Sequence, residues 1–409
     1  MNVTWALAWR NLWRHRRRTW LTVGAMVFSN VLLIFLVSLQ LGSYRMMIEG
    51  SLGAFTGHIQ IQRKGYFDEQ HMYQSLPRAA KLAAQLRTMP GVESAAARAE
   101  AFALASSEQR SFGILLTGVE PAFEPGVSTF PGKLRAGRYL QDGTAGEIVI
   151  GSVLAQNLKV GPGDELTFLG SGRDGSLAAA VATVVGILET GLEDVDRSMA
   201  QVPLNWFQEV FSMGDAGHSV VVRTPGLEQV QTTVRALRAL PAVGEELVVL
   251  DWDRLLPGLR QAITSDMASA WFTYSVLVVL VAFSVLNTQL MSVLERTREF
   301  GVMLALGMGP ARLARLLGLE TLLLAGLGLA LGVAGGSLLA AYLSVAGFTY
   351  PGVEEMMAKF MLGGRIYPEF SLTAVLLGPA AVFVGAMMAA LYPALRLFQL
   401  QPVAAMRAV

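Results

Sequence analysis

Four apolar stretches, each long enough to cross a lipid bilayer, constrain this chain more than any other feature. They cover residues 20–42, 267–293, 316–346 and 372–392. About 20 apolar residues suffice for a transmembrane helix. The composition agrees, because 53% of the 409 residues are hydrophobic and only 15% are charged, against roughly a quarter charged in ordinary globular proteins. The sequence therefore predicts a membrane protein with four transmembrane α-helices.

Arginines mark the same side of all four stretches. In residues 1–19, Trp5, Trp9 and Trp13 recur at helical spacing, which predicts an amphipathic helix at the membrane interface with arginines reaching lipid phosphates. The flanking arginines are Arg10, Arg14, Arg16, Arg17, Arg18, Arg296, Arg298, Arg312, Arg315, Arg396 and Arg407. Positive charge is retained on the cytoplasmic side. Both termini and residues 294–315 are therefore expected in the cytoplasm, including the tail 393–409, with residues 43–266 and the loop 347–371 outside.

The outer region 43–266 is too large for a loop and predicts an α/β domain with an internal repeat. Each copy starts with a strand after a histidine, at residues 58–62 and 218–222, and continues into a helix and a second strand. Two strand–helix–strand units of this kind can pair in one split βαβ layer. Residues 106–215 are rich in strand and turn signals. We expect them to form a β-rich insertion between residues 43–105 and 216–266.

Residues 294–315 join the second and third apolar stretches through a charged, helical turn. Gly309 and Pro310 predict the start of a new helix, since proline is favoured at the first helical position. Phe300 and Met303 beside charged residues suggest an apolar anchor with a polar rim, as in a docking surface. A solvated loop of charges is the alternative. The candidate docking residues are Glu295, Arg296, Arg298, Glu299, Phe300, Met303, Leu304 and Gly307.

Two features of the third stretch call for an explanation. Glu320 lies one or two turns inside it, where an ionisable group is costly and usually functional; the alternative is that it pairs with Arg315 or Arg396 at the interface. Gly328, Gly332 and Gly336 are four residues apart. Small residues at this spacing let two membrane helices approach closely, although glycine is also common in membrane helices generally.

The sequence contains no motif for catalysis or cofactor binding. No phosphate-binding loop follows a predicted strand, the four histidines lack metal-ligand spacing, and no nucleophile motif is present. The absence of cysteine excludes disulfides and thiolate metal sites. The basic block abuts an apolar stretch, which favours contact with membrane lipid over nucleic acid. We expect a non-catalytic chain without a cofactor of its own.

Three segments resemble the membrane subunits of the MacB/FtsX/LolC-type ABC transporters. They are residues 8–12 (AWRNL), residues 292–307 (SVLERTREFGVMLALG), and the C-terminal residues 392–407. The resemblance implies a Porter-like outer domain with a Sabre-like insertion, in the bacterial inner membrane. It implies that residues 294–315 meet a separate ABC ATPase, which binds ATP and magnesium, and that a second permease subunit, identical or paralogous, completes the transporter. Mechanotransmission, in which ATP binding bends the outer domains, is the implied mechanism.

Residues 57–62 (GHIQIQ) and 65–68 (GYFD) are similar to the LolC/LolE branch, which implies release of lipoprotein to a periplasmic carrier. The acylated substrate would then enter between the first two helices. Candidate residues for this path are Tyr44, Met47, Ile48, Met267, Trp271 and Phe272, and an outer cluster at Met356, Met357, Phe360 and Met361 could extend it; all could instead be interfacial. Two alternatives remain open: a MacB-like efflux permease acting with a membrane-fusion protein, and an FtsX-like signalling module that controls an external hydrolase.

Overall fold

The computed structural model of the chain describes residues 3–14, 16–108, 110–143, 146–349, 351–352 and 364–399. It divides into two compact units. The first comprises residues 1–45, 262–350 and 365–409, and the second comprises residues 46–261 and 351–364. The outer cluster of methionines expected at residues 356–361, and the last part of the predicted tail, lie outside the described residues.

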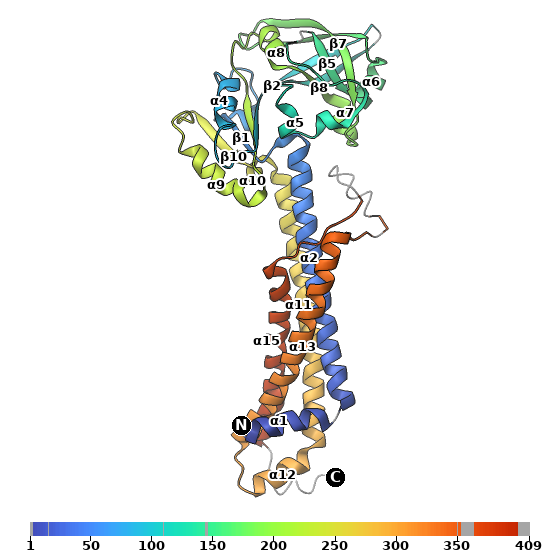
Figure 1. Ribbon diagram of the computed structural model, residues 1–409, viewed down its shortest axis with the longest axis vertical. Coiled ribbons are helices and arrows are strands. Elements are labelled where there is room, and N and C mark those ends of the chain that lie inside the picture. Colours follow the sequence, from blue (N-terminus) through green and yellow to red (C-terminus); the bar gives the residue numbers. More distant parts are fainter. Residues whose placement is uncertain are drawn as a thin grey trace. The chain divides into compact units, whose positions relative to one another are not determined.

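The first unit is a bundle of long helices (Figure 1). Its elements are α1 (Val3–Arg14), α2 (Arg16–Ser51), α11 (Pro257–Glu295), α12 (Thr297–Ala305), α13 (Pro310–Ala346), α15 (Leu372–Arg396) and the 3₁₀ turn η3 (Leu397–Gln399). Met26, Val281, Ala325 and Val382 meet in one buried cluster, so α2, α11, α13 and α15 share a core. These four helices are long and apolar enough to cross a membrane. At about 1.5 Å per residue, the 37 residues of α13 extend well past a hydrocarbon layer of about 30 Å.

The three glycines of α13 lie against α2. A Cβ atom added at Gly332 would stand 2.5 Å from the Cβ of Asn30, and one at Gly328 would stand 2.7 Å from the Cβ of Met26. Gly336 faces Ile34 in the same way. Asn30 also donates a hydrogen bond from Nδ2 to the Gly328 carbonyl at 3.2 Å. Backbone contact at this distance needs residues without side chains on α13.

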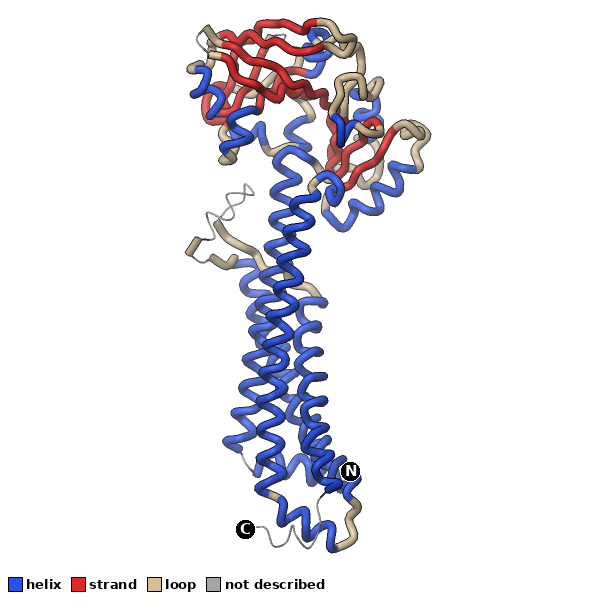
Figure 2. Tube along the Cα trace, turned by 180° about the vertical axis from the view of Figure 1, so that it is seen from behind, coloured by secondary structure: helices blue, strands red, loops and turns tan. Residues whose placement is uncertain are grey.

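The second unit contains a ten-stranded sheet (Figure 2). The strands are β1 (Ile59–Arg63), β2 (Ser94–Ser106), β3 (Ser111–Val119), β4 (Leu134–Gly137), β5 (Glu147–Gly151), β6 (Glu165–Ser171), β7 (Leu177–Leu188), β8 (Met199–Pro203), β9 (Ser219–Arg223) and β10 (Leu247–Asp251). Their order is β10-β1-β9-β2-β3-β8-β5-β7-β4, with β6 pairing to β2 and β7. The helical segments are η1 (Leu52–Thr56), α3 (Tyr66–Glu69), α4 (Ala79–Leu86), α5 (Glu124–Val127), η2 (Phe130–Lys133), α6 (Ser152–Leu158), α7 (Glu193–Ser198), α8 (Leu204–Val210), α9 (Leu227–Arg238) and α10 (Trp252–Leu255).

The two strand–helix–strand units interleave in this sheet. Strand β1 pairs antiparallel with both β9 and β10, and β9 in turn pairs antiparallel with β2. Leu82 and Leu86 of α4 and Val230 and Val234 of α9 pack into one core with the inward residues of these strands, such as Ile61. Both helices therefore cover the same face of the sheet, as a split βαβ layer requires.

Strand β2 joins this layer to the rest of the sheet. Its alternating alanines from Ala95 to Ala105 face the core, because successive side chains of a strand point to opposite faces. Its first half pairs with β9 and its second half with β3 and β6. The β-rich region is thus hydrogen-bonded into the same sheet instead of forming a separate one.

A buried ion pair lies on the other face of β2. Arg98 contacts both carboxylate oxygens of Glu124 at 3.1 and 2.6 Å, and both side chains are almost completely buried. The same guanidinium lies over the ring of Phe55 and donates to its carbonyl. Phe55 belongs to η1, a single turn of π-helix that directly follows α2. This pair therefore ties the chain that leaves α2 to β2 and α5.

Candidate functional site

The segment between α11 and α13 is a short helix with defined ends. It breaks from α11 at Arg296 and ends at Gly307, where φ is +92°. The amide of Gly307 donates to the Leu304 carbonyl, and that of Met308 donates to the Met303 carbonyl, both at 3.0 Å. This is the Schellman arrangement, in which glycine supplies the left-handed residue after a helix. The residues expected to form a docking segment are thus held in a fixed hairpin with α13.

The apolar side of α12 faces its own chain. Phe300 is only 2% exposed and packs with Val293, Leu313, Leu317 and Leu397. Met303 and Leu304 are partly buried against the same cluster. The ring of Phe300 is therefore not exposed as an apolar anchor in this structure, because it fastens α12 to α13 and to the turn after α15.

Arg296, expected in the docking segment, and Glu320, expected one or two turns inside the third apolar stretch, form a buried pair. Arg296 Nη1 lies 3.1 and 3.2 Å from the two carboxylate oxygens of Glu320, and each side chain is 8% exposed. Asn11 of α1 donates to Glu320 Oε1 at 2.7 Å. The predicted partners of Glu320, Arg315 and Arg396, are thus incorrect. The break at Arg296 brings its side chain toward α13, so the pair compensates both charges.

The N-terminal arginines hold the exposed side of this hairpin. Arg14 Nη1 contacts Glu299 Oε1 at 2.8 Å, and Arg18 Nη2 contacts Glu295 Oε2 at 2.9 Å. Burial raises the pKa of the Glu299 carboxyl, but hydrogen bonds from Arg296 and Arg14 outweigh burial and hold this pKa below its ordinary value. Sequence reasoning assigned these arginines to lipid. The signal it missed was the matching spacing in the sequence: Arg14 and Arg18 are four residues apart, and so are Glu295 and Glu299.

A stripe of side chains stays accessible on α12. Arg298, Val302 and Leu306 are exposed and lie four residues apart, and Leu306 is 83% exposed. Residues at this spacing share one side of a helix. Leu294 at the end of α11 is exposed as well. Another protein can bind to an exposed apolar stripe of this kind beside Arg298. Val302, Leu306 and Leu294 were absent from the docking residues predicted from the sequence.

The residues expected to form a substrate path fall into two groups. Met267, Trp271 and Phe272 are exposed on α11, whereas Tyr44 and Ile48 are buried and Met47 is partly buried on α2. The Tyr44 hydroxyl donates to Asp266 Oδ2 at 2.6 Å and accepts from Gln40 Nε2 at 2.6 Å. Tyr274 donates to Gln40 Oε1 at 2.6 Å. Hydrogen bonds therefore join α2 and α11 at the place where the path was expected to open.

The second unit exposes an apolar sheet surface on its β-rich side. Leu104 of β2 lies directly opposite Leu169 of β6. Phe102, Leu177 and Val181 are also exposed on these neighbouring strands. Exposed apolar patches of this kind are commonly interaction surfaces in soluble domains.

Two protein-family models together match most of the chain. The MacB-like periplasmic core domain matches residues 19–240, which is more than half of the sequence, and the FtsX-like permease C-terminal model matches residues 271–402. The chain belongs to the MacB/FtsX/LolC-type ABC transporter permeases. This permease is therefore a multi-pass membrane protein with a large periplasmic domain.

Curated relatives of this permease are named lipoprotein-releasing system transmembrane protein LolC. That of Xylella fastidiosa is 26% identical over 333 residues, covering 78% of this chain and 79% of the relative. That of Neisseria meningitidis serogroup B is 23% identical over 407 residues, covering 95% and 94%. Among solved structures, the periplasmic region of MacB from Actinobacillus actinomycetemcomitans matches with a TM-score of 0.37 at 16% identity, covering 52% of this chain and 94% of that one.

Proposed function

We propose that this permease couples ATP hydrolysis by a separate ABC ATPase to the extraction of a lipoprotein, or another acylated lipid, from the inner membrane. ATP and magnesium are bound by the ATPase, and a second permease subunit completes the transporter. Both termini and α12 lie on the cytoplasmic side. The work is transmitted to the periplasmic domain through the long helices without a central pore. The names of the curated relatives support this choice of substrate.

The geometry of α12 carries the proposal. Its inner side is fixed by Phe300 and by the Arg296–Glu320 pair, and its outer side presents Val302 and Leu306. A force applied to this outer side reaches α13 through packed side chains instead of being lost in a flexible loop. Arg14 and Arg18 add α1 and α2 to the same rigid group.

Binding of the ATPase to this stripe is tested with Leu306→Asp. We expect the variant to insert and purify normally but to lose co-purification of the ATPase subunit, because a carboxylate would be buried without a partner in the interface. Arg17→Ala is the matched control, since Arg17 is also exposed on the predicted cytoplasmic side but lies outside α12. Retention of the ATPase and of coupled turnover in the Leu306→Asp complex would remove the basis for docking at α12.

The substrate is tested with the reconstituted transporter. Stimulation of its ATPase rate by an acylated lipoprotein, and not by the same protein without its acyl chains, would support lipoprotein release. Co-purification of a membrane-fusion protein, without lipoprotein stimulation, would favour efflux instead. Stimulation only by an external hydrolase partner would favour the signalling alternative.

A further inference from the structure

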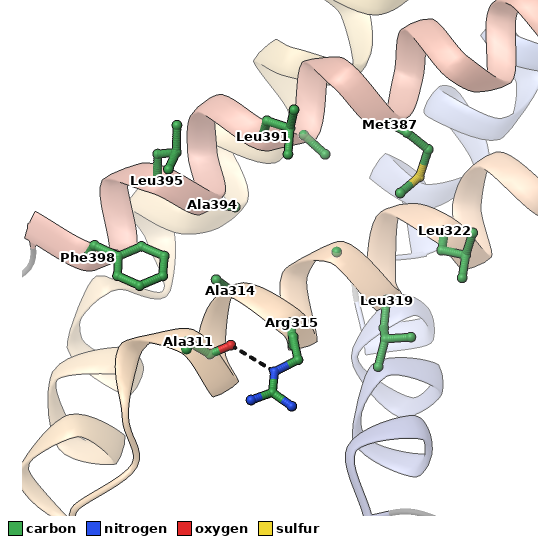
Figure 3. A pocket seen from close by; sticks show the side chains of 12 residues that line it. Ala311, Ala314, Arg315, Leu319, Leu322, Met387, Leu391, Ala394, Leu395 and Phe398 are labelled. Carbon is green, nitrogen blue, oxygen red and sulfur yellow. Dashed lines mark hydrogen bonds between the residues drawn. The ribbon is translucent and has the colours of Figure 1, made fainter.

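A groove of about 640 Å³ lies between α13 and α15 and is assigned to no part of the proposed mechanism. It runs from Ala311 and Phe398 at one end to Leu322 and Met387 at the other (Figure 3). This volume is within the range of about 300–1,000 Å³ typical of ligand sites. The groove is open because α13 contributes Gly318 where a larger side chain would fill it; a Cβ there meets nothing within 4 Å.

The dimensions of the groove match one membrane leaflet. Its lining on α13 extends from Ala311 to Leu322, which is roughly 16 Å at about 1.5 Å per residue. Half of a hydrocarbon core of about 30 Å is roughly 15 Å. Both helices are of membrane-spanning length and composition. Gly318, Leu319, Leu322, Met387, Ala390 and Leu391 line the groove within the expected spans, and the rest of its lining continues toward the expected cytoplasmic side. The groove therefore begins in the leaflet nearest α12 and ends at the level of the headgroups, and its length suits most of an acyl chain.

A positive charge at one end of the groove indicates an anionic headgroup on the ligand. Arg315 is the one charged residue among the described residues that line it, and the others are apolar or glycine. Its Nε donates to the Ala311 carbonyl at 3.4 Å, and its side chain is exposed (Figure 3). Arg315 also lines a neighbouring pocket with Arg312, Arg14 and Glu299. Cations therefore outnumber acids around this end of the groove.

We propose that this groove binds an anionic phospholipid, with one acyl chain between α13 and α15 and its phosphate at Arg315 and Arg312. Guanidinium groups bind phosphate through paired hydrogen bonds, and basic pockets between membrane helices suit anionic headgroups. A phospholipid provides both the apolar chain and the anion.

The proposed headgroup position lies next to the α12 hairpin. The neighbouring pocket that contains Arg315 and Arg312 also contains Arg296, Glu299 and Met303 of the α12 hairpin. A phosphate at Arg315 and Arg312 of α13 would lie beside the α12 hairpin. In this proposal the lipid is a structural component of the permease, distinct from any acylated substrate.

The test is lipid binding by the full-length permease purified in detergent without its ATPase, measured by native mass spectrometry. Phosphatidylglycerol is compared with phosphatidylcholine of the same acyl chains. We expect a preference of roughly tenfold for the anionic lipid, because the trimethylammonium group of phosphatidylcholine offsets the charge of its own phosphate. Arg315→Gln should reduce this preference, since it removes one of the two cations at the headgroup. Gly318→Leu fills the groove and should reduce the binding of both lipids.

Two controls separate this site from general lipid contact. Arg396→Gln removes a cation from α15 that does not line the groove, and Gly326→Leu adds the same side chain elsewhere on α13 where a Cβ also meets nothing. Both should bind lipid as the unmodified chain does. Equal binding of the two lipids, or unchanged binding in both Arg315→Gln and Gly318→Leu, would overturn the proposal. Loss of self-association in Gly318→Leu with unchanged lipid binding would assign the groove to a second copy instead.

Discussion

The buried pair between Arg296 and Glu320 gives the sharpest test of how the α12 hairpin is held against α13. Removing one partner of a buried ion pair costs about 3–5 kcal/mol, because the other charge stays buried without compensation. Arg296→Met should reach this range, since among the described residues Glu320 would keep only the hydrogen bond from Asn11. Glu320→Gln should cost less, because Arg296 still contacts Glu299 at 3.2 Å and lies over the Phe300 ring.

The pair is isolated by a double-mutant cycle on the free energy of unfolding in detergent. Arg296→Met combined with Glu320→Gln removes both charges, so the double variant should be less destabilised than the sum of the single ones by roughly 3 kcal/mol. Arg14→Met with Glu299→Gln is the matched control, because this exposed pair should show a coupling below about 1 kcal/mol. A coupling near zero for Arg296 and Glu320 would refute the contact and its share in holding α12.

Two further predictions concern the helix contact and the periplasmic domain. Gly332→Ala should lower the free energy of unfolding by about 1–3 kcal/mol through overpacking against Asn30, whereas Gly326→Ala, where a Cβ meets nothing, should be neutral or stabilising; equal effects would disprove close packing at Gly332. Burial lowers the pKa of His218 to about 4 from 6.5, so the folded state takes up its proton less readily than the unfolded state. The contribution of His218 to the free energy of unfolding is fully present above about pH 6.5 and is lost as the pH falls toward 4. The loss is about 2 kcal/mol between pH 7.5 and pH 5. His218→Gln should lose this part of the pH dependence of thermal unfolding, and an unchanged slope would contradict it.

His218 shows why this shift needs the folded structure. Its Nδ1 accepts a hydrogen bond from the Glu100 amide at 2.9 Å, and its Nε2 lies 3.2 Å from the Met72 carbonyl. Tyr66 stacks on the ring at 4.8 Å between centroids. A proton on Nδ1 would point at the amide hydrogen of Glu100, so the neutral form of the ring is favoured. The sequence indicated that His218 precedes a strand, but its three neighbours come from distant parts of the chain.

The sequence located the charged helical turn at residues 294–315 but did not show which side of it is accessible. Phe300 and Val302 are both apolar and only two residues apart, and helical periodicity alone does not say which one faces the protein. The answer depends on Leu397, more than 90 residues later, which packs over Phe300. Glu320 posed the same problem, because Arg296, Arg315 and Arg396 were all reachable in principle. The break between α11 and α12 selected Arg296.

By itself the sequence determined what local pattern can determine: four apolar stretches of membrane length, a basic N-terminal segment, two strand–helix–strand units and a charged turn. These follow from periodicity and from the cost of placing charge in a bilayer, which do not require a knowledge of distant contacts. The tertiary structure decided which charges pair, which apolar residues remain exposed, and where a groove is left open between α13 and α15. Those outcomes depend on side chains from different helices, 24 residues apart in the Arg296–Glu320 pair and up to 87 apart across the groove, because burial and ion pairing are properties of the assembled chain.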